Sequence, residues 1–222
     1  MTYLELVNEV LKRLREDSIS AIEGNTTGLL IGAFVNLAKD EVESSWNWTA
    51  LRTDLSITTV AGQPTAYITN SNARTRLLSP EDGHEAYNVT AKHALDRVPS
   101  GWLDHVRFLG SAASGPPTKF SVIGINPSDD TLQIRLYPTP NDTYTLTFPV
   151  VKPQDRLESS STNLIIPWRP VVEKAYLYAI MERGEDAGQY SEMQHNVVKQ
   201  ALADAIGNDS HRLSDETVWI PR

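Results

Sequence analysis

The sequence predicts an α+β fold: an antiparallel four-helix bundle formed by N- and C-terminal helical hairpins, with an inserted antiparallel β domain and an extended C-terminal tail. Two observations predict it. Apolar side chains recur at a helical period of about 3.6 residues near both ends of the chain, whereas the residues between them alternate with a period of two. We therefore expect a bundle from residues 1–52 and 166–207, a β domain over residues 53–165, and a C-terminal extension over residues 208–222.

The first helix is predicted at the very start of the chain. Thr2 and Glu5 have the spacing of a capping box, in which each side chain satisfies a backbone amide that the first turn leaves unbonded. The apolar residues that follow have a 3-4-3 spacing, which places them on one stripe of a helix: Leu4, Val7, Leu11 and Leu14.

The second helix is expected over residues 28–48. Its apolar residues form a broad stripe, which indicates burial against more than one neighbour. They are Leu30, Ile31, Phe34, Val35, Leu37, Ala38, Val42 and Trp46. The charged residues of this helix are assigned to its solvent-facing side: Lys39, Asp40, Glu41 and Glu43.

Strands are predicted where apolar and polar residues alternate. The strongest runs are residues 132–137 and 143–148, separated by a turn rich in Pro, Asn and Asp, and residues 119–125 precede them as a third strand. We expect these three consecutive strands to form a meander. Weaker strands are expected at residues 55–60, 66–69 and 86–90, and a loop at residues 99–117.

The closing hairpin begins at Trp168, because Pro167 and Pro170 are tolerated in a first helical turn, where the amides have no partner in the helix. Gly184 is expected to end this helix, and Gly207 the next one, with Asp186 as a cap between them. The core of the bundle is assigned to seven residues: Leu4, Leu11, Phe34, Trp46, Trp168, Tyr176 and Val197.

The charge of the chain indicates that the protein does not bind a nucleic acid tightly. The formal net charge is −8, and residues 1–52, 53–151 and 152–222 carry 5 basic and 8 acidic, 7 and 9, and 8 and 11 groups, so that their net charges are −3, −2 and −3. No segment therefore supplies a basic patch for phosphates. The chain has no cysteine, which excludes disulfides and thiol catalysis, and no apolar run of membrane-spanning length, so we expect no membrane partner.

A search for chemical motifs predicts no enzyme, no metal and no cofactor. His84, His93 and His105 lack the spacing that places two imidazoles on one helical face. The paired carboxylates Glu41 with Glu43, and Glu81 with Glu85, have no neighbours that indicate the desolvation an acid–base pair needs; we assign them to solvated surfaces.

Three segments carry a resemblance to a known family. Residues 43–48, Glu-Ser-Ser-Trp-Asn-Trp, end a helix and lead straight into strands; residues 132–140 and 144–148 form a strand pair; and residues 164–168, Leu-Ile-Ile-Pro-Trp, open a closing helical pair. This order resembles the head-to-tail adaptor proteins of short-tailed bacteriophages, also described as tubular tail or head-completion proteins. The resemblance covers nearly the whole chain in architecture, through short motifs.

The resemblance implies a virion protein that folds in the host cytoplasm and then forms a ring, typically of twelve copies, between the portal and the tail nozzle or tube. DNA would pass through this ring without specific binding. The C-terminal extension would reach the portal, and its anchors are expected at the last five residues: Val218, Trp219, Ile220, Pro221 and Arg222. A tail that folds back on its own bundle is the alternative for this segment.

Two other functions stay open at this point. The β domain could be a binding module for a carbohydrate or for another virion protein, and Tyr67, Tyr87 and Trp102 would be candidates if they gathered on one exposed sheet face. A hydrolase that uses carboxylates, with Glu81 or Glu85 as the catalytic group, is the second alternative.

Overall fold

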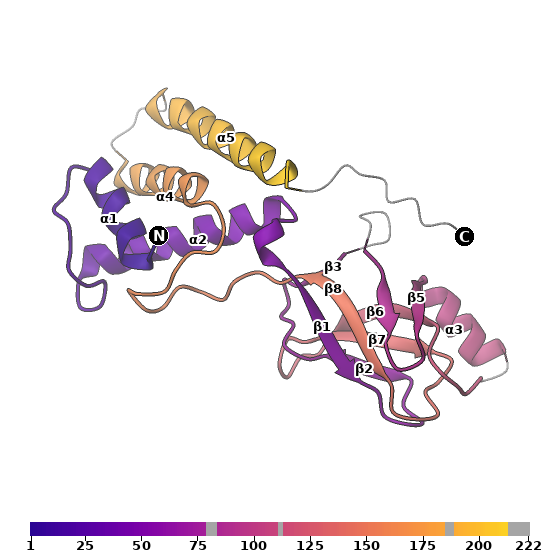
Figure 1. Ribbon diagram of the computed structural model, residues 1–222. Coiled ribbons are helices and arrows are strands. Elements are labelled where there is room, and N and C mark those ends of the chain that lie inside the picture. Colours follow the sequence, from indigo (N-terminus) through magenta and orange to yellow (C-terminus); the bar gives the residue numbers. More distant parts are fainter. Residues whose placement is uncertain (79–83, 111–112, 185–188, 213–222) are drawn as a thin grey trace. The chain divides into compact units, whose positions relative to one another are not determined.

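The computed structural model describes residues 1–78, 84–110, 113–184 and 189–212. The chain divides into two compact units (Figure 1). The first, which we call the helical unit, consists of Met1–Leu51 and Pro153–Arg222, and the second, the β unit, consists of Arg52–Lys152. No helix in the described parts of the chain is both long enough and apolar enough to span a membrane.

Helices α1 (Tyr3–Arg13) and α2 (Thr26–Ser45) open the helical unit. The predicted capping box is confirmed: the Glu5 amide donates to Thr2 Oγ1, and the Thr2 amide donates to Glu5 Oε2. Helix α2 begins earlier than expected because Asn25 caps it by accepting from the Gly28 amide. The two helices approach closely, since a Cβ at Gly32 would lie 2.3 Å from Tyr3 Oη.

Helices α4 (Trp168–Arg183) and α5 (Gln189–Ser210) complete the helical unit. Gly184 ends α4 with a φ of 61°, a left-handed conformation that glycine adopts at little cost, so the predicted stop is confirmed. Helix α5 continues through Gly207 to Ser210, three residues beyond its predicted end. The predicted cap at Asp186 lies outside the described residues.

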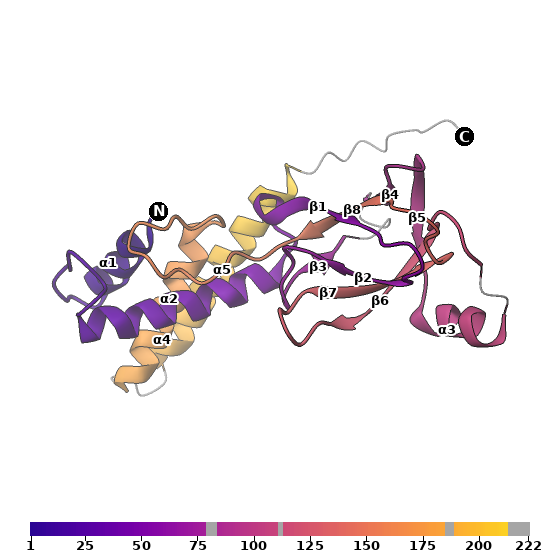
Figure 2. The same cartoon turned by 90° about the horizontal axis from the view of Figure 1, so that it is seen from below.

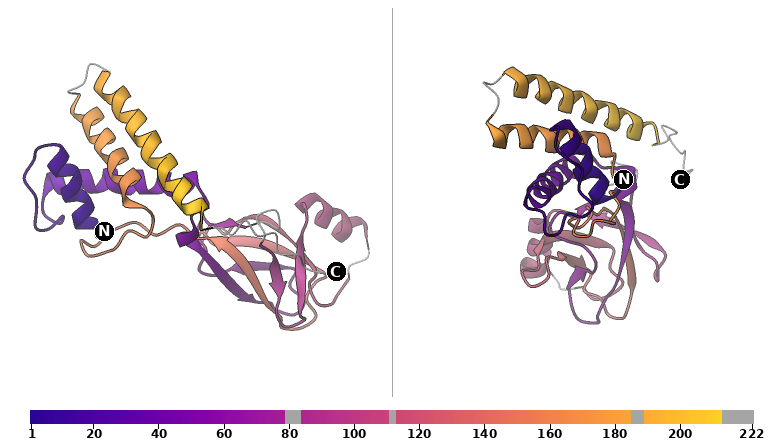
Figure 3. Two further views of the ribbon diagram at one scale, coloured as in Figure 1. Left: turned by 45° about the horizontal axis from the view of Figure 1, so that its top comes forward. Right: turned by 90° about the vertical axis from the view of Figure 1, so that its left-hand side faces the viewer.

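Helix α4 lies at the centre of the helical unit. It packs against α1 and α2 on one side and against α5 on the other, as Figures 1 and 3 show. Its middle turns are accordingly buried on nearly every side, including Val171, Val172, Ala175 and Ala179. Helix α5 contacts α4 along its length, whereas no comparable packing joins α5 to α1 or α2 among the described residues.

The β unit holds one eight-stranded sheet. The strands are β1 (Arg52–Thr58), β2 (Thr65–Ile68), β3 (Arg76–Leu77), β4 (Ala86–Asn88), β5 (His93–Arg97), β6 (Lys119–Ile125), β7 (Leu132–Tyr137) and β8 (Thr145–Val151). Their order is β1-β8-β4-β5-β6-β7-β2, and β3 pairs with β8 beside this path. The end strands β1 and β2 also contact each other, so the sheet curls into a nearly closed, barrel-like shape (Figure 2).

The predicted meander is wrong. Strand β6 pairs with β7 as expected, but β7 then pairs with β2, while β8 pairs with β1, β3 and β4. Alternation in the sequence shows that a segment is half-buried in a sheet; it carries no information about which strand lies next to it. The core of the sheet is apolar and includes an edge-to-face pair, Phe120 and Phe148, with ring centroids 5.1 Å apart.

A helix occupies the segment that the sequence predicted as a loop. Helix α3 (Ser100–Leu109) connects β5 to β6, which run parallel, and it packs beside β6 and β7 (Figure 2). Leu103 is its one buried residue. Trp102, Leu103, Val106 and Leu109 recur at a helical spacing, so the signal for this helix was present in the sequence and the loop prediction missed it.

The predicted fold class is therefore wrong. The described residues form a mixed α/β fold with five α-helices and a large, nearly closed sheet, in place of a four-helix bundle with an inserted antiparallel β domain. Three observations overturn the prediction. Among the described residues α5 packs along its length on α4 and has no comparable packing on α1 or α2, α3 is a fifth helix, and β5 and β6 are parallel.

Candidate functional site

Helix α5 buries only a narrow stripe, because it packs along its length against the single helix α4. Its buried residues are Gln194, Val198, Ala201, Ala205 and Asp209. Beside this stripe lie three large, exposed side chains at positions i, i+3 and i+7: Tyr190, Met193 and Val197. Met193 is 67% exposed. We call these three residues the α5 face.

Helix α2 has a second exposed apolar surface. Ile31, Val35, Ala38 and Val42 form its buried side, whereas Leu29, Leu30, Ala33 and Leu37 are exposed on the other side. Leu29 is 55% exposed. We call these four exposed residues the α2 face. Because α4 lies between α2 and α5, the α2 face and the α5 face are two separate surfaces of the helical unit (Figure 3).

A groove of about 240 Å³ lies between the start of α4 and the end of α5. Nine residues line it: Pro167, Arg169, Pro170, Ala201, Asp204, Ala205, Asn208, Asp209 and Arg212. Prolines and buried alanines give it an apolar floor. Two arginines stand at its rim, where Arg169 Nη1 lies 3.7 Å from Asp204 Oδ2.

Asp209 fixes the end of α5 to the end of α2. Its side chain is nearly fully buried and accepts three hydrogen bonds: from Trp46 Nε1 at 3.1 Å, from the Thr49 amide at 2.9 Å and from Thr49 Oγ1 at 2.6 Å. Thr49 begins the short 3₁₀-helix η1 (Thr49–Leu51). The carboxylate therefore holds the last turn of α5, at the groove, against the turn that follows α2.

Three buried polar side chains of α2 hold the extended segment that precedes α4. Asn36 Oδ1 accepts from the Leu157 amide at 2.8 Å, and Asn36 Nδ2 donates to the Leu157 carbonyl at 3.0 Å. Lys39 Nζ donates to the Gln154 carbonyl at 2.7 Å, and Glu43 Oε1 accepts from the Gln154 amide at 3.1 Å. Lys39 and Glu43 also form an ion pair with each other at 3.2 Å.

A smaller polar cluster joins α2 to α4. Burial alone would raise the pKa of Glu41, but hydrogen bonds from Lys174 and Tyr178 outweigh it and hold this pKa below its ordinary value. Desolvation, followed by the hydrogen bond to Glu41, raises the pKa of Tyr178. Desolvation and the Tyr190 hydroxyl, 3.3 Å away, raise the pKa of Tyr176 to about 12.

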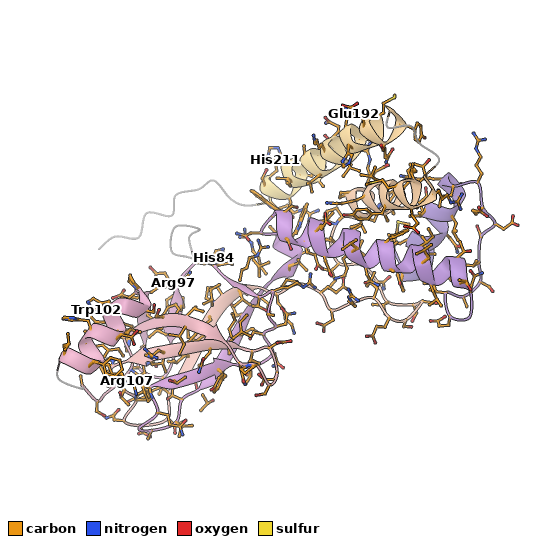
Figure 4. The ribbon with its side chains drawn as sticks, turned by 180° about the vertical axis from the view of Figure 1, so that it is seen from behind. His84, Arg97, Trp102, Arg107, Glu192 and His211 are labelled. Carbon is orange, nitrogen blue, oxygen red and sulfur yellow. The ribbon has the colours of Figure 1, made fainter. Side chains whose placement is uncertain are left out.

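The residues considered for chemistry or for sugar binding lie apart. Tyr67 is on β2, Tyr87 on β4 and Trp102 on α3, where its ring packs edge-on against Tyr137. Figure 4 shows Trp102 and Arg107 on α3, and His84 away from them. The described residues contain no group of three metal-ligating side chains. Glu81 lies outside them.

One comparison decides the family. The model of a family described as the SU10 adaptor protein matches residues 1–219. The chain belongs to the SU10 adaptor protein family. The family predicted from the sequence is thereby confirmed: this is a bacteriophage adaptor, a component of the virion that interacts with other virion proteins. No curated protein matches the chain.

The residues that the sequence assigned to the core of the adaptor have different environments. Leu11 is buried, and four others are partly buried: Leu4, Phe34, Trp46 and Tyr176. Trp168 and Val197 are instead exposed, by 42% and 41%. Both belong to helices of an open arrangement, in which α5 covers one side of α4 and no further helix among the described residues covers α5.

Sequence reasoning missed several residues that shape these surfaces. Trp48 is fully buried and donates to the Val42 carbonyl, whereas Trp46 was taken as the anchor. Lys39 and Glu43 were assigned to the solvent side and are completely buried. Their spacing of four residues, with Asn36 three residues before, was the available signal for a polar row. The predicted portal anchors lie outside the described residues: Val218, Trp219, Ile220, Pro221 and Arg222.

Proposed function

We propose that this adaptor forms a ring, typically of twelve copies, that joins the portal to the tail nozzle or tube and surrounds the path of the DNA. The proposal also gives the protein a structural role and no catalytic one. The observation that carries it is the pair of apolar surfaces on the helical unit, the α2 face and the α5 face.

Two different surfaces are what a ring requires. In a head-to-tail assembly each copy presents one surface to the copy before it and another to the copy after it, whereas a two-fold dimer uses one surface twice. We assign the α2 face of one copy to contact the α5 face of the next. Leu37 and Met193 are examples of large side chains that this contact would take out of water. Apolar groups buried at the centre of an interface usually supply most of its binding energy.

The C-terminal residues are assigned to the portal. Val218, Trp219 and Ile220 are three consecutive apolar residues near the end of a segment that also carries Asp215, Glu216 and Arg222. Aromatic and aliphatic anchors of this kind bind in pockets of a partner protein. Truncation after Arg212 is therefore expected to weaken attachment to the portal.

The charge of the adaptor fits a channel through which DNA must slide. With a net charge of −8, spread over all three parts of the sequence, the protein repels phosphates more than it holds them. A ring of such subunits would let DNA pass without specific binding.

The test is the mass of the protein by light scattering, alone and after mixing with the portal ring from the same phage. The 24.7 kDa chain is expected to add to the portal in multiple copies, which gives the stoichiometry directly. A portal that gains no mass at low and at moderate salt would overturn the proposed function. The variant truncated after Arg212 is the control for attachment through the C-terminal residues.

A further inference from the structure

The groove between α4 and α5 lies where the described chain ends. Arg212 is one of its lining residues, and residues 213–222 follow directly. The groove has an apolar floor of prolines and alanines. Its rim carries Arg169 and Arg212, and each lies 3.7 Å from an aspartate that also lines the groove, Asp204 and Asp209. The floor fits a large apolar side chain.

The sequence after Arg212 supplies such a side chain. Val218, Trp219, Ile220 and Pro221 lie six to nine residues after Arg212, and these apolar residues match the floor of the groove. In size, a cavity of roughly 150 Å³ already holds benzene, so a groove of about 240 Å³ accommodates one large aromatic side chain.

The length of this segment also fits. Six residues lie between Arg212 and Trp219, and the seven Cα-to-Cα steps span at most about 25 Å when the chain is fully extended. The groove runs beside α5 from Ala201 to the end of the helix, a rise of about 14 Å. The chain can therefore turn back and reach every part of the groove. A tethered segment also has an effective concentration in the millimolar range, which favours binding to its own chain.

We propose that, in the free protein, the groove binds residues 213–222 of the same chain, with Trp219 on its floor. Its role in assembly rests on the proposed function, because the same segment is assigned to the portal. Groove and portal then compete for Trp219. Binding to the portal releases the segment from the groove. In the free adaptor the groove covers Trp219, the largest apolar anchor.

The chain has no cysteine, so a pair of introduced cysteines can test whether the segment lies in the groove. In the variant Asp204→Cys with Val218→Cys, one thiol stands at the rim of the groove and the other next to Trp219. The matched control is Ala203→Cys with Val218→Cys, because Ala203 is exposed, neighbours Asp204 in sequence and does not line the groove. A disulfide forms only when the two Cα atoms come within about 7 Å.

Dilute protein, oxidised without the portal, is analysed for linked monomer and linked dimer. We expect the Asp204→Cys pair to close within one chain at least about tenfold faster than the control, at a rate independent of concentration. Equal rates for the two pairs would overturn the proposal. Disulfides that form only between chains would also overturn it, and would assign the groove to the segment of a neighbouring copy.

A second step separates this proposal from the proposed function. The linked protein is mixed with the portal ring before and after reduction of the disulfide. Binding that appears only after reduction is the expected result. Equal binding by the linked protein would overturn the competition between groove and portal. Because Val218 is one of the proposed portal anchors, the unmodified protein is mixed with the portal ring in parallel. Failure of the unmodified protein to bind would overturn the proposed function, while the disulfide result would still assign the groove.

Discussion

At the scale of single residues, Asp209 is a buried carboxylate whose replacement by the amide of the same size should destabilise the helical unit. Its carboxylate accepts from Trp46 Nε1 and from two donors of Thr49. Asp209→Asn keeps the size of the side chain. Its NH₂ group, however, is a donor and would face the donors of Trp46 and Thr49. Because buried donors without an acceptor cost about 1–3 kcal/mol, we expect the free energy of unfolding to fall by this amount in a urea titration.

Asp204→Asn is the matched control, because it is the same substitution on the same helix at an exposed position. Its effect should stay within about 0.5 kcal/mol, the usual range for surface substitutions. Equal unfolding midpoints for the two variants would show that the Asp209 hydrogen bonds contribute nothing to stability.

Glu41 should make the stability depend on acidic pH. Hydrogen bonds from Lys174 and Tyr178 lower its folded pKa, so its stabilisation is fully present above the unfolded value of 4.5 and is lost as the pH falls through the lowered folded pKa. Glu41→Gln should therefore reduce the unfolding midpoint at pH 7 and have little effect well below pH 4. Urea titrations at several pH values test this. A difference between the two proteins that does not change with pH would contradict it.

At the scale of elements, the polar row on α2 is the part of the fold that ties two distant segments of the chain together. Lys39→Met would leave the Glu43 carboxylate buried without the ammonium group, a change that costs about 3–5 kcal/mol when a buried pair is broken from one side. We expect the double variant Lys39→Met with Glu43→Leu to lose less than the sum of the two single variants. A double-mutant cycle by urea titration measures this coupling. Additive losses would show that the two side chains act independently.

The polar row on α2 also shows which features of a helix can be predicted from the sequence and which cannot. Helix α2 was found because Ile31, Val35 and Val42 repeat at a helical period. That Lys39 is buried could not be predicted from this apolar pattern, because one of the groups that hold it in the interior, besides Glu43, is the Gln154 carbonyl, 115 residues away. Charged side chains are almost never buried unless paired, and the pairing becomes visible only in the fold.

For the strands too, local patterns could be predicted from the sequence and long-range contacts could not. Residues 119–125 and 132–137 were predicted at the bounds that β6 and β7 have, since each alternates or carries β-branched residues over a full strand length. Strands β3 and β5 were missed because they are short, or bounded by polar residues that hide the alternation. The order of the strands depends on contacts across the sheet, which a single sequence does not encode in any local pattern.

At the scale of the whole molecule, the sequence identified apolar residues of the two candidate surfaces but did not show that these residues are exposed. Leu30, Leu37 and Val197 were read as parts of buried stripes, because an apolar residue at helical spacing looks the same whether it faces its own core or another copy. The structure separates the two cases by exposure. An exposed apolar patch rimmed by polar residues is typical of a protein-interaction site.

The ring proposal predicts that each of the two faces is necessary. Leu37→Glu on the α2 face and Met193→Glu on the α5 face should each prevent assembly, because a charge buried in an interface without a partner is strongly unfavourable. Both residues are exposed in the single chain, so the free energy of unfolding should change by no more than about 0.5 kcal/mol. Ser161→Glu, at an exposed position in the segment that precedes α4 and on neither of the two helices, is the control that should assemble normally.

Mixing the two defective variants distinguishes a head-to-tail contact from a two-fold one. The Leu37→Glu protein keeps an intact α5 face, and the Met193→Glu protein keeps an intact α2 face. One contact can therefore form between them, and growth must then stop, because the remaining two faces are both defective. Light scattering of the mixture should show complexes no larger than two chains under conditions in which the unmodified protein assembles further. Large assemblies in the mixture, or pairs formed by one variant alone, would contradict the assignment of the α2 face to the α5 face of the next copy.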